Sequence, residues 1–293
     1  MSSPVWVRWT SRILALSLLA MVSTRQMGCP PPPENCSEFG YADVNGLSIS
    51  YKSMGTGGPV VIFMSGMGDN SSVWNKVLPG VAEFTTGVVY NRGGVSCTEE
   101  GTNPRTADVI ADELKGFLDT LGLQDPVIIC AHSIAGIFAR YFANQYPERV
   151  AGMVLVDCTH EDLDDELARI MTPQALAEED LAYGYYFDEL DHYIGAVGEY
   201  YNKNFSYRLV RDNNALTDMP FIYLGATQYV HALESPEQAA LADGIKQNFD
   251  QVQANLVPSG VLIEVDSSHE VQVEKPQAVI DAVKQVFDDL TVP

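Results

Sequence analysis

The stretch Pro126-Val-Ile-Ile-Cys-Ala-His-Ser-Ile-Ala-Gly-Ile137 decides the fold of this chain. Its first five residues are mostly apolar and β-branched, which is typical of a strand buried on both faces. Small residues then surround Ser133, and residues 137–146 continue as a helix that ends before Pro147. A strand, a sharp turn with a central Ser and a helix predict that the Ser133 hydroxyl stands above the strand end, near backbone N–H groups of the new helix.

Strands alternate with helices along much of the remaining chain. Before the stretch we expect a hairpin over residues 39–54, because Asn45-Gly46 lies between alternating apolar residues. The other expected strands are residues 59–64, 86–90, 150–157, 219–225 and 261–265, and the other expected helices are residues 106–121, 235–256 and 276–290. Such alternation favours a mostly parallel sheet covered on both faces. The sequence therefore predicts an α/β fold with a sheet of about eight strands flanked by helices.

Residues 158–219 interrupt the alternation. This segment has no strand of the same quality, and it is rich in acidic and aromatic residues. We interpret it as a helical cap, inserted after the strand that ends at Asp157. The core of the domain then comprises residues 39–157 and 220–293.

The N-terminal segment is predicted to be a targeting signal, residues 1–28. Two arginines precede an apolar run at residues 13–22, which is too short to span a bilayer and suits the apolar core of a signal peptide. A Pro-rich spacer, residues 29–38, follows. We therefore expect an exported protein, secreted or periplasmic. Lipid anchoring through Cys29 is the alternative, since Met27-Gly28-Cys29 faintly resembles a bacterial lipoprotein motif.

The cysteines and the charge give further expectations. Export permits disulfides, and Cys29 and Cys36 could close a small loop ahead of the core, whereas Cys130 and Cys158 are expected as buried free thiols. The chain has 17 basic and 39 acidic residues among 293, a net charge of −22. This balance argues against nucleic acid and anionic membranes as partners, because both require a basic face.

The turn around Ser133 resembles the nucleophile elbow of the α/β-hydrolase superfamily, whose pattern is G-x-S-x-G. Here the pattern is Ala131-His132-Ser133-Ile134-Ala135, with the smallest residue that has a Cβ at both Gly positions. The opening hairpin, the β-α repeats and the helical insert also follow the order of that fold. The resemblance is to serine esterases and lipases with a helical cap, and it implies the α/β-hydrolase fold.

A Ser hydroxyl needs a His to take its proton and a carboxylate to orient that His. In this superfamily the chain order is Ser, acid, His, so the His is expected after the last strand. His269 lies there, followed by an acidic residue, a Pro and an amphipathic last helix, which is similar to the closing segment of the family. His132 resembles the usual His of the elbow, which is structural.

The acid of this expected triad has two candidates. The usual family position is the loop after the strand at residues 219–225, which contains no acidic residue in its first turn and reaches Glu234 only before the next helix. Asp157 lies at the end of the strand that follows the elbow helix, at the rim where ligands bind in open parallel sheets. Some branches of the superfamily place their acid at that strand end. We favour Asp157 and keep Glu234 as the alternative.

The oxyanion hole requires two backbone N–H groups, and the resemblance assigns them to Met67 and Ile134. Met67 belongs to Ser65-Gly66-Met67-Gly68, where the family often has His-Gly-x-Gly. Because the donors are main-chain groups, the replacement of His leaves the hole possible. Asn91 stands where the family commonly has Asp, and we expect it to support the loop.

The resulting hypothesis is a serine hydrolase that cleaves a carboxylic ester through an acyl-enzyme, with Ser133, His269 and Asp157 as the triad. Amide, thioester and lactone substrates would use the same groups. No cofactor is implied, and no His pair has the spacing of a zinc site, so no catalytic metal is expected. The aromatic insert suggests a small apolar acyl substrate, although a packed cap would explain it equally well. The alternative function is a catalytically inactive, secreted domain that binds a ligand or a partner.

Overall fold

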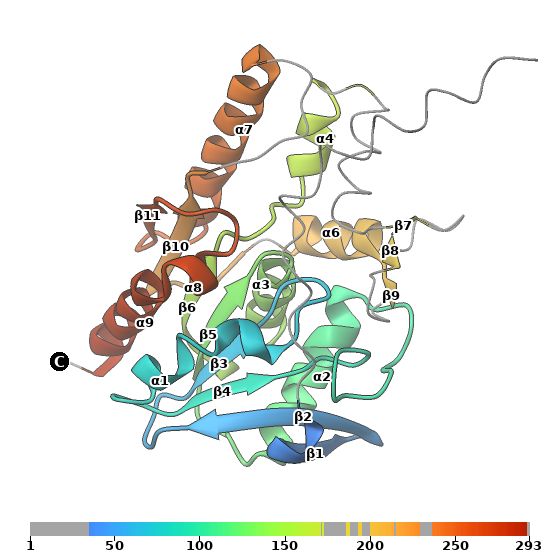
Figure 1. The fold of residues 1–293 in the computed structure, drawn as a ribbon, viewed down its shortest axis with the longest axis vertical. Coiled ribbons are helices and arrows are strands. Elements are labelled where there is room, and N and C mark those ends of the chain that lie inside the picture. The colour runs from blue at the N-terminus through green and yellow to red at the C-terminus, as the bar shows by residue number, and fades with distance from the viewer. Residues whose placement is uncertain are drawn as a thin grey trace, which may run out of the picture.

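The computed structural model describes residues 35–170, 172, 186–187, 193–194, 200–213, 215–228 and 236–291 (Figure 1). The predicted signal peptide, Cys29 and Glu234 lie outside these residues, so the structure does not bear on them. Across the described ranges, no helix combines the length and the apolar character that a membrane span requires.

The secondary structure begins with a short 3-10 helix, Cys36–Glu38, and ends with α9. The strands are β1 (Gly40–Val44), β2 (Leu47–Met54), β3 (Val61–Met64), β4 (Gly87–Tyr90), β5 (Val127–His132), β6 (Val150–Val156), β7 (Tyr186–Phe187), β8 (Tyr193–Ile194), β9 (Tyr200–Tyr201), β10 (Phe221–Ala226) and β11 (Val261–Val265). The α-helices are α1 (Leu78–Val81), α2 (Ala107–Thr120), α3 (Ala135–Gln145), α4 (Leu163–Leu167), α6 (Lys203–Asp212), α7 (Pro236–Ala254), α8 (Val271–Glu274) and α9 (Pro276–Thr291). Two further 3-10 helices are η3 (Ser71–Trp74) and η4 (Pro147–Arg149).

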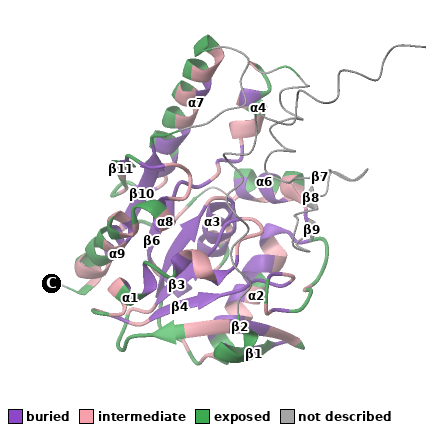
Figure 2. Ribbon diagram, in the orientation of Figure 1, coloured by how far each residue is buried: buried purple, intermediate pink, exposed green. Residues whose placement is uncertain are grey.

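The main sheet has eight strands in the order β1-β2-β4-β3-β5-β6-β10-β11. Its first two contacts, β1 with β2 and β2 with β4, are antiparallel, and the remaining neighbours are parallel. The predicted mostly parallel sheet of about eight strands is confirmed. The central strands β3, β4, β5 and β6 are buried almost throughout, whereas β1 at the edge is largely exposed (Figure 2).

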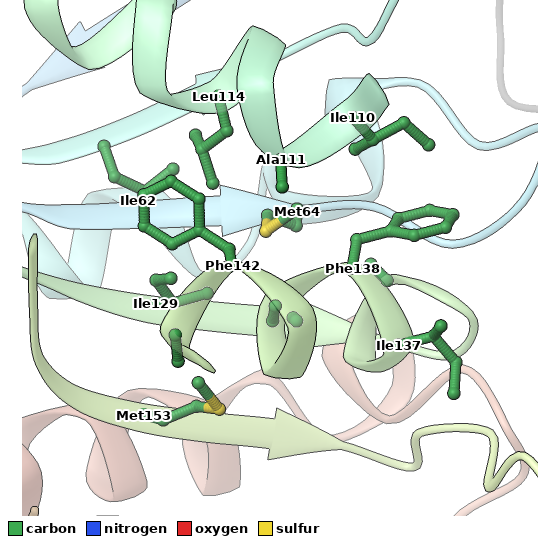
Figure 3. Packing of buried hydrophobic residues seen from close by; sticks show 14 of the residues in the cluster. Ile62, Met64, Ile110, Ala111, Leu114, Ile129, Ile137, Phe138, Phe142 and Met153 are labelled. Atoms are coloured by element: carbon green, nitrogen blue, oxygen red, sulfur yellow. The ribbon is translucent and has the colours of Figure 1, made fainter. Parts of the chain in front are cut away.

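Successive residues of the central strands enter two separate apolar layers, because side chains alternate between the faces of a sheet. In β3, Ile62 and Met64 pack on the face that α3 covers with Phe138 (Figure 3). Val61 and Phe63 pack on the opposite face, in a cluster that includes residues of α1 and α9. This double burial is why these strands contain runs of apolar residues rather than alternating polar and apolar ones.

The hairpin that opens the sheet has the predicted turn. Val44 pairs with Leu47 across the antiparallel strands β1 and β2. Between them, Asn45 and Gly46 both have positive φ, 55° and 90°. Asn and Gly tolerate this backbone conformation better than other residues, and two such residues in succession form the hairpin turn.

The predicted pairing of Cys36 with Cys29 is wrong, because Cys36 is bonded to Cys97. Hydrogen bonds between the hairpin and the loop after β4 explain the change of partner. The backbone N–H of Ser50 donates to Oγ1 of Thr98 at 2.9 Å, next to Cys97 in sequence. This contact holds the loop against β2 and brings Cys97 toward the start of β1. Cys130 and Cys158 are buried free thiols, as expected.

The segment between β6 and β10 contains helices and strands in its described part. It includes α4 and α6, and beside these helices of the expected cap it also contains a three-stranded sheet in the order β7-β8-β9. A buried bidentate ion pair between Arg140 and Glu161 fixes the start of this segment to α3. Tyr201 and Tyr207 are buried within the main apolar cluster, which favours a packing role for these two aromatic residues.

Candidate active site

Ser133 occupies the turn between β5 and α3, in a backbone conformation that costs free energy. Its φ is 56°, in the left-handed region, where a residue other than Gly costs about 1–3 kcal/mol. Hydrogen bonds to the end of β6 and to the segment after it hold Ser133 there: the Ser133 N–H donates to Val156 O, and the Thr159 N–H donates to Ser133 O, both at 3.1 Å. The half-buried Ser133 is therefore held at the carboxyl ends of two parallel strands.

The first residues of α3 approach the end of β6 closely. Ala131 and Ala135, which replace the glycines of the family pattern, are fully buried, so their Cβ atoms fit. The glycine that the packing requires is Gly136, where a Cβ would lie 2.5 Å from Cβ and 2.6 Å from Sγ of Cys158. The sequence does contain Gly136 in the elbow, but its importance depends on Cys158, a contact that the motif does not predict.

Asp157 lies directly after β6, next to the turn that holds Ser133. Its side chain is buried, and its φ of 43° is also in the left-handed region. Oδ2 lies 2.6 Å from Nδ1 of His269, while Oδ1 accepts the Ala226 N–H at 2.9 Å and Nζ of Lys246 at 2.7 Å. Burial alone would raise the pKa of Asp157, but the charges and hydrogen bonds of Lys246 and His269 outweigh it and hold this pKa far below its usual range.

His269 lies in the loop after β11, and 41% of its side chain is exposed. Its Nδ1–H donates to the Asp157 carboxylate, which leaves Nε2 free of that contact. Desolvation would lower the pKa of His269, but the hydrogen bond and charge of Asp157, together with the charge of Glu270, raise it above its ordinary value.

Ser133 and His269 are connected through His132. The ring centroids of His132 and His269 are 4.6 Å apart, and Nε2–H of His132 donates to the carbonyl oxygen of His269 at 3.0 Å. Among the described residues, no hydrogen bond joins the Ser133 hydroxyl to His269. Such bonds between nucleophile and base are often long before substrate binds. The structure therefore brings Asp157 and His269 together and places Ser133 next to their neighbour, whereas the catalytic roles stay predictions.

The loop after β3 passes directly beside Ser133. A Cβ at Gly66 would lie 3.2 Å from Cβ of Ser133 and 3.0 Å from Nδ1 of His132, so only Gly allows this approach without displacement. Arg92 donates to the carbonyl oxygen of Gly66 at 2.8 Å, and this hydrogen bond holds the loop in place. Met67 follows in the same loop, and Ile134 precedes the first residue of α3, where backbone N–H groups lack partners within the helix. Their assignment as oxyanion donors remains a prediction.

Two departures from the family pattern support the same loop. Ser65, at the position where His is common, accepts the indole N–H of Trp74 at 3.1 Å. The side-chain oxygen of Asn91 accepts the Ser71 N–H at 2.7 Å, and its amide donates to Oγ of Ser50 at 3.0 Å. Asn91 therefore supports the loop, as expected from the sequence.

The structure also contains a polar group beside Ser133 that the sequence did not predict. Donor atoms of Asp69, His132 and Glu270 all lie within 4.8 Å of one another, which is close enough for a shared metal ion. Burial raises the pKa of Asp69 to about 6 and lowers that of His132 to about 4. The amide of Gln272 donates to Glu270 at 2.8 Å and also contacts Nδ1 of His132 at 3.3 Å. Gln272 thus joins Glu270 to His132, and the Asp69 carboxylate lies 3.8 Å from Nδ1 of His132. The expectation that no metal takes part in catalysis stays a prediction.

A second set of residues was missed by the sequence analysis. Lys246 and Asp250 lie one turn apart on α7, and Lys246 contacts both Asp157 and Asp250. The sequence does contain this pair at a spacing of four residues, but such a spacing usually indicates an exposed ion pair. Its contact with Asp157 depends on the order of β6 and β10 in the sheet, which local patterns do not give.

Comparison with known proteins agrees with this fold. A family model described as "alpha/beta hydrolase fold" matches residues 59–191, a range that begins before β3 and includes Ser133 and Asp157. A putative carbamate hydrolase of Azorhizobium caulinodans is 26% identical over 117 residues, which is 40% of this chain and 43% of that protein. The chain matches half or less of the length of its curated relatives, from 16% to 50%.

Solved structures match over most of their length at low identity. A thermophilic esterase from Thermogutta terrifontis is 17% identical, with a TM-score of 0.59 over 86% of this chain and 98% of that chain. An enol-lactonase from Burkholderia xenovorans is 16% identical, with a TM-score of 0.60 over 85% of this chain and 99% of that chain. At this level of identity the likeness concerns the fold alone, so the site must be argued from its own geometry.

Proposed function

We propose that this chain, which has the α/β-hydrolase fold and matches the model of that family over residues 59–191, is a serine hydrolase of carboxylic esters. The observation that carries the proposal is the 2.6 Å contact between Oδ2 of Asp157 and Nδ1 of His269, beside the strained turn that holds Ser133. A buried carboxylate fixes the orientation of the imidazole and stabilises its positive charge. A structural role alone would give no reason for a Ser in a left-handed conformation at the same strand ends.

In the proposed reaction, the Ser133 hydroxyl oxygen attacks the acyl carbon while Nε2 of His269 accepts its proton. The N–H groups of Ile134 and Met67 stabilise the oxyanion of the tetrahedral intermediate. His269 then gives the proton to the departing alkoxide, so an alcohol leaves and the acyl group remains on Ser133. A water molecule releases the acid by the same steps, again with His269 as base and then acid.

The substrate class is proposed as a small apolar acyl ester. Ser133 as nucleophile leaves no requirement for a cofactor in either step. Proteins similar to this chain are named as an esterase, an enol-lactonase and a putative carbamate hydrolase, and all three names describe hydrolysis at an acyl carbon.

Export is part of the same proposal. The apolar run at residues 13–22 suits a signal peptide. The Cys36–Cys97 disulfide supports this, because disulfides persist in oxidising compartments and are rare in the cytosol. Lipid anchoring through Cys29 would hold the enzyme at the membrane, still on the exported side.

Labelling with a fluorophosphonate tests the function directly. The full chain should lose activity on a short-chain nitrophenyl ester as it becomes labelled, and peptide mapping should find the label on Ser133. Ser133→Ala should abolish labelling, whereas Ser53→Ala, a change at an exposed Ser of β2, should leave it intact. A folded protein that neither reacts nor hydrolyses the ester would instead be the non-catalytic binding domain considered from its sequence.

A further inference from the structure

Lys246 connects helix α7 to the carboxylate that orients His269. Its Nζ lies 2.7 Å from Oδ1 of Asp157, and 2.6 Å and 2.8 Å from the two oxygens of Asp250. The side chains are almost removed from water, with 13% of Lys246, 2% of Asp157 and 6% of Asp250 exposed. A buried ammonium shared by two carboxylates interacts much more strongly than an exposed ion pair.

We propose that Lys246 is a positioning residue for the Asp157–His269 pair: it fixes the rotation of the Asp157 carboxylate and, together with Asp250, sets how much negative charge His269 experiences. This inference rests on the proposed function, since it concerns the same triad. Lys246 would contact neither the substrate nor the reacting atoms, and it would act through Asp157.

The rotation follows from the hydrogen bonds of the two carboxylate oxygens. Oδ1 of Asp157 receives Lys246 from α7 and the Ala226 N–H from the end of β10. Both donors lie on the same side, so Oδ2 remains for Nδ1 of His269. Without Lys246, the Ala226 N–H would still hold Oδ1 and keep Oδ2 toward the imidazole, but the orientation of the carboxylate would be less sharply defined.

The effect on the pKa of His269 follows from the charges of three neighbouring side chains. Asp157, Lys246 and Asp250 together carry a net charge of −1, so the ammonium does not cancel the field that Asp157 exerts on His269. The positive charge of Lys246 opposes the rise in the pKa of His269 that Asp157 causes. Asp250 has the opposite effect on the pKa of His269, because its carboxylate adds a second negative charge beside the ammonium. Tyr223 completes the cluster by donating its hydroxyl hydrogen to Asp250 or to the Cys158 carbonyl oxygen.

Other charged groups near His269 are distributed over several elements. They are Asp157 after β6, Lys246 on α7, His132 on β5, Asp69 in the loop after β3 and Glu270 in the same loop as His269. Of these, only Lys246 is a permanent cation at neutral pH. A variant of Lys246 therefore changes the field at His269 without replacing any group that touches it.

The experiment measures the pKa of His269 by NMR titration of its ring proton in the full chain, which requires no turnover. Lys246→Met should raise this pKa by roughly one unit, as expected for loss of one nearby charge. Asp250→Asn should lower it, and the double variant should lie between the two single variants. Lys246→Arg keeps the charge and should stay near the parent value. Lys284→Met is the matched control, because Lys284 also pairs with an Asp four residues later but is exposed on α9.

Activity on the nitrophenyl ester provides the second readout. The acid limb of kcat/KM should move with the NMR pKa in each variant, and kcat should fall more than KM changes in Lys246→Met. Shifts of equal sign in Lys246→Met and Asp250→Asn, or no shift in either, would overturn the inference. If Lys246→Met does not fold, Asp250→Asn decides alone, because a pKa of His269 that stays unchanged or rises in that variant would overturn the inference. Opposite NMR shifts in a chain without esterase activity would refute the proposed function while supporting the charge coupling.

Discussion

The close approach of Gly136 to Cys158 leads to a prediction about stability and activity together. Gly136 is in the first turn of α3, three residues after Ser133, and Cys158 follows Asp157 directly. In Gly136→Ala, the new Cβ would lie 2.5 Å from Cβ of Cys158, a separation that real Cβ atoms do not show. Either α3 or the segment after β6 must move; Ser133 lies in the turn just before α3, and Asp157 is the first residue of that segment.

The magnitude follows from two opposing effects. Replacing Gly by Ala inside a helix normally stabilises a protein by about 0.5–1 kcal/mol, because the unfolded chain loses conformational freedom. Overpacking of a well-packed interior costs about 1–3 kcal/mol. Because both atoms that the new Cβ meets belong to a buried residue next to the main chain, we expect the steric effect to dominate, with a net loss of about 1–2 kcal/mol.

Gly244→Ala provides the matched control for this experiment. Gly244 lies in the middle of α7, and a Cβ there would meet no atom within 4 Å. This variant should gain about 0.5–1 kcal/mol. Urea denaturation of both variants at neutral pH would measure the difference, with the ester assay on the same samples. Equal or higher stability of Gly136→Ala relative to Gly244→Ala would show that the contact with Cys158 does not explain the glycine.

Three further predictions concern the triad and the disulfide. In the nitrophenyl ester assay, Asp157→Asn should lower kcat by about 10³–10⁴-fold, because the imidazole loses its charged partner. The control Asp266→Asn, a change at a nearby exposed acid, should leave kcat within a few-fold of the parent value. Only neutral His269 accepts a proton, and its pKa is raised above 6.5. We therefore expect kcat/KM to fall as the pH drops through a midpoint above 6.5. A pH profile whose acid limb is centred below 6.5 would contradict this. Replacing both Cys36 and Cys97 by Ser should cost about 2–4 kcal/mol in urea denaturation under non-reducing conditions, and a reductant should remove the difference from the parent protein.

The sheet could be predicted from the sequence because its signals are local. Runs of buried β-branched residues, such as those of β5, and the Asn45-Gly46 turn depend only on neighbours in the chain. Their order along the chain, once the resemblance was recognised, also predicted that Asp157 and His269 would meet at the same edge. The contact between them is present at 2.6 Å.

Contacts between distant segments could not be predicted in the same way. Cys97 became the partner of Cys36 because Thr98 binds Ser50, 48 residues earlier, and nothing in the spacing of the cysteines indicates this. Lys246 reaches Asp157 over 89 residues for the same kind of reason. The insert was interpreted as helical from the absence of strong strands, but strands of two residues give no pattern that a sequence analysis detects.

The position of the acid has a physical explanation in the order of the strands. The resemblance to the α/β-hydrolases leads us to expect the acid after the strand that corresponds to β10, whereas the proposed acid, Asp157, follows β6, the strand beside it. The end of β10 still contributes, since the Ala226 N–H holds Oδ1 of Asp157. The helix that follows β10 contributes Lys246, which binds the same oxygen. The proposed acid therefore lies at the end of β6, while β10 and α7 supply the donors that orient it.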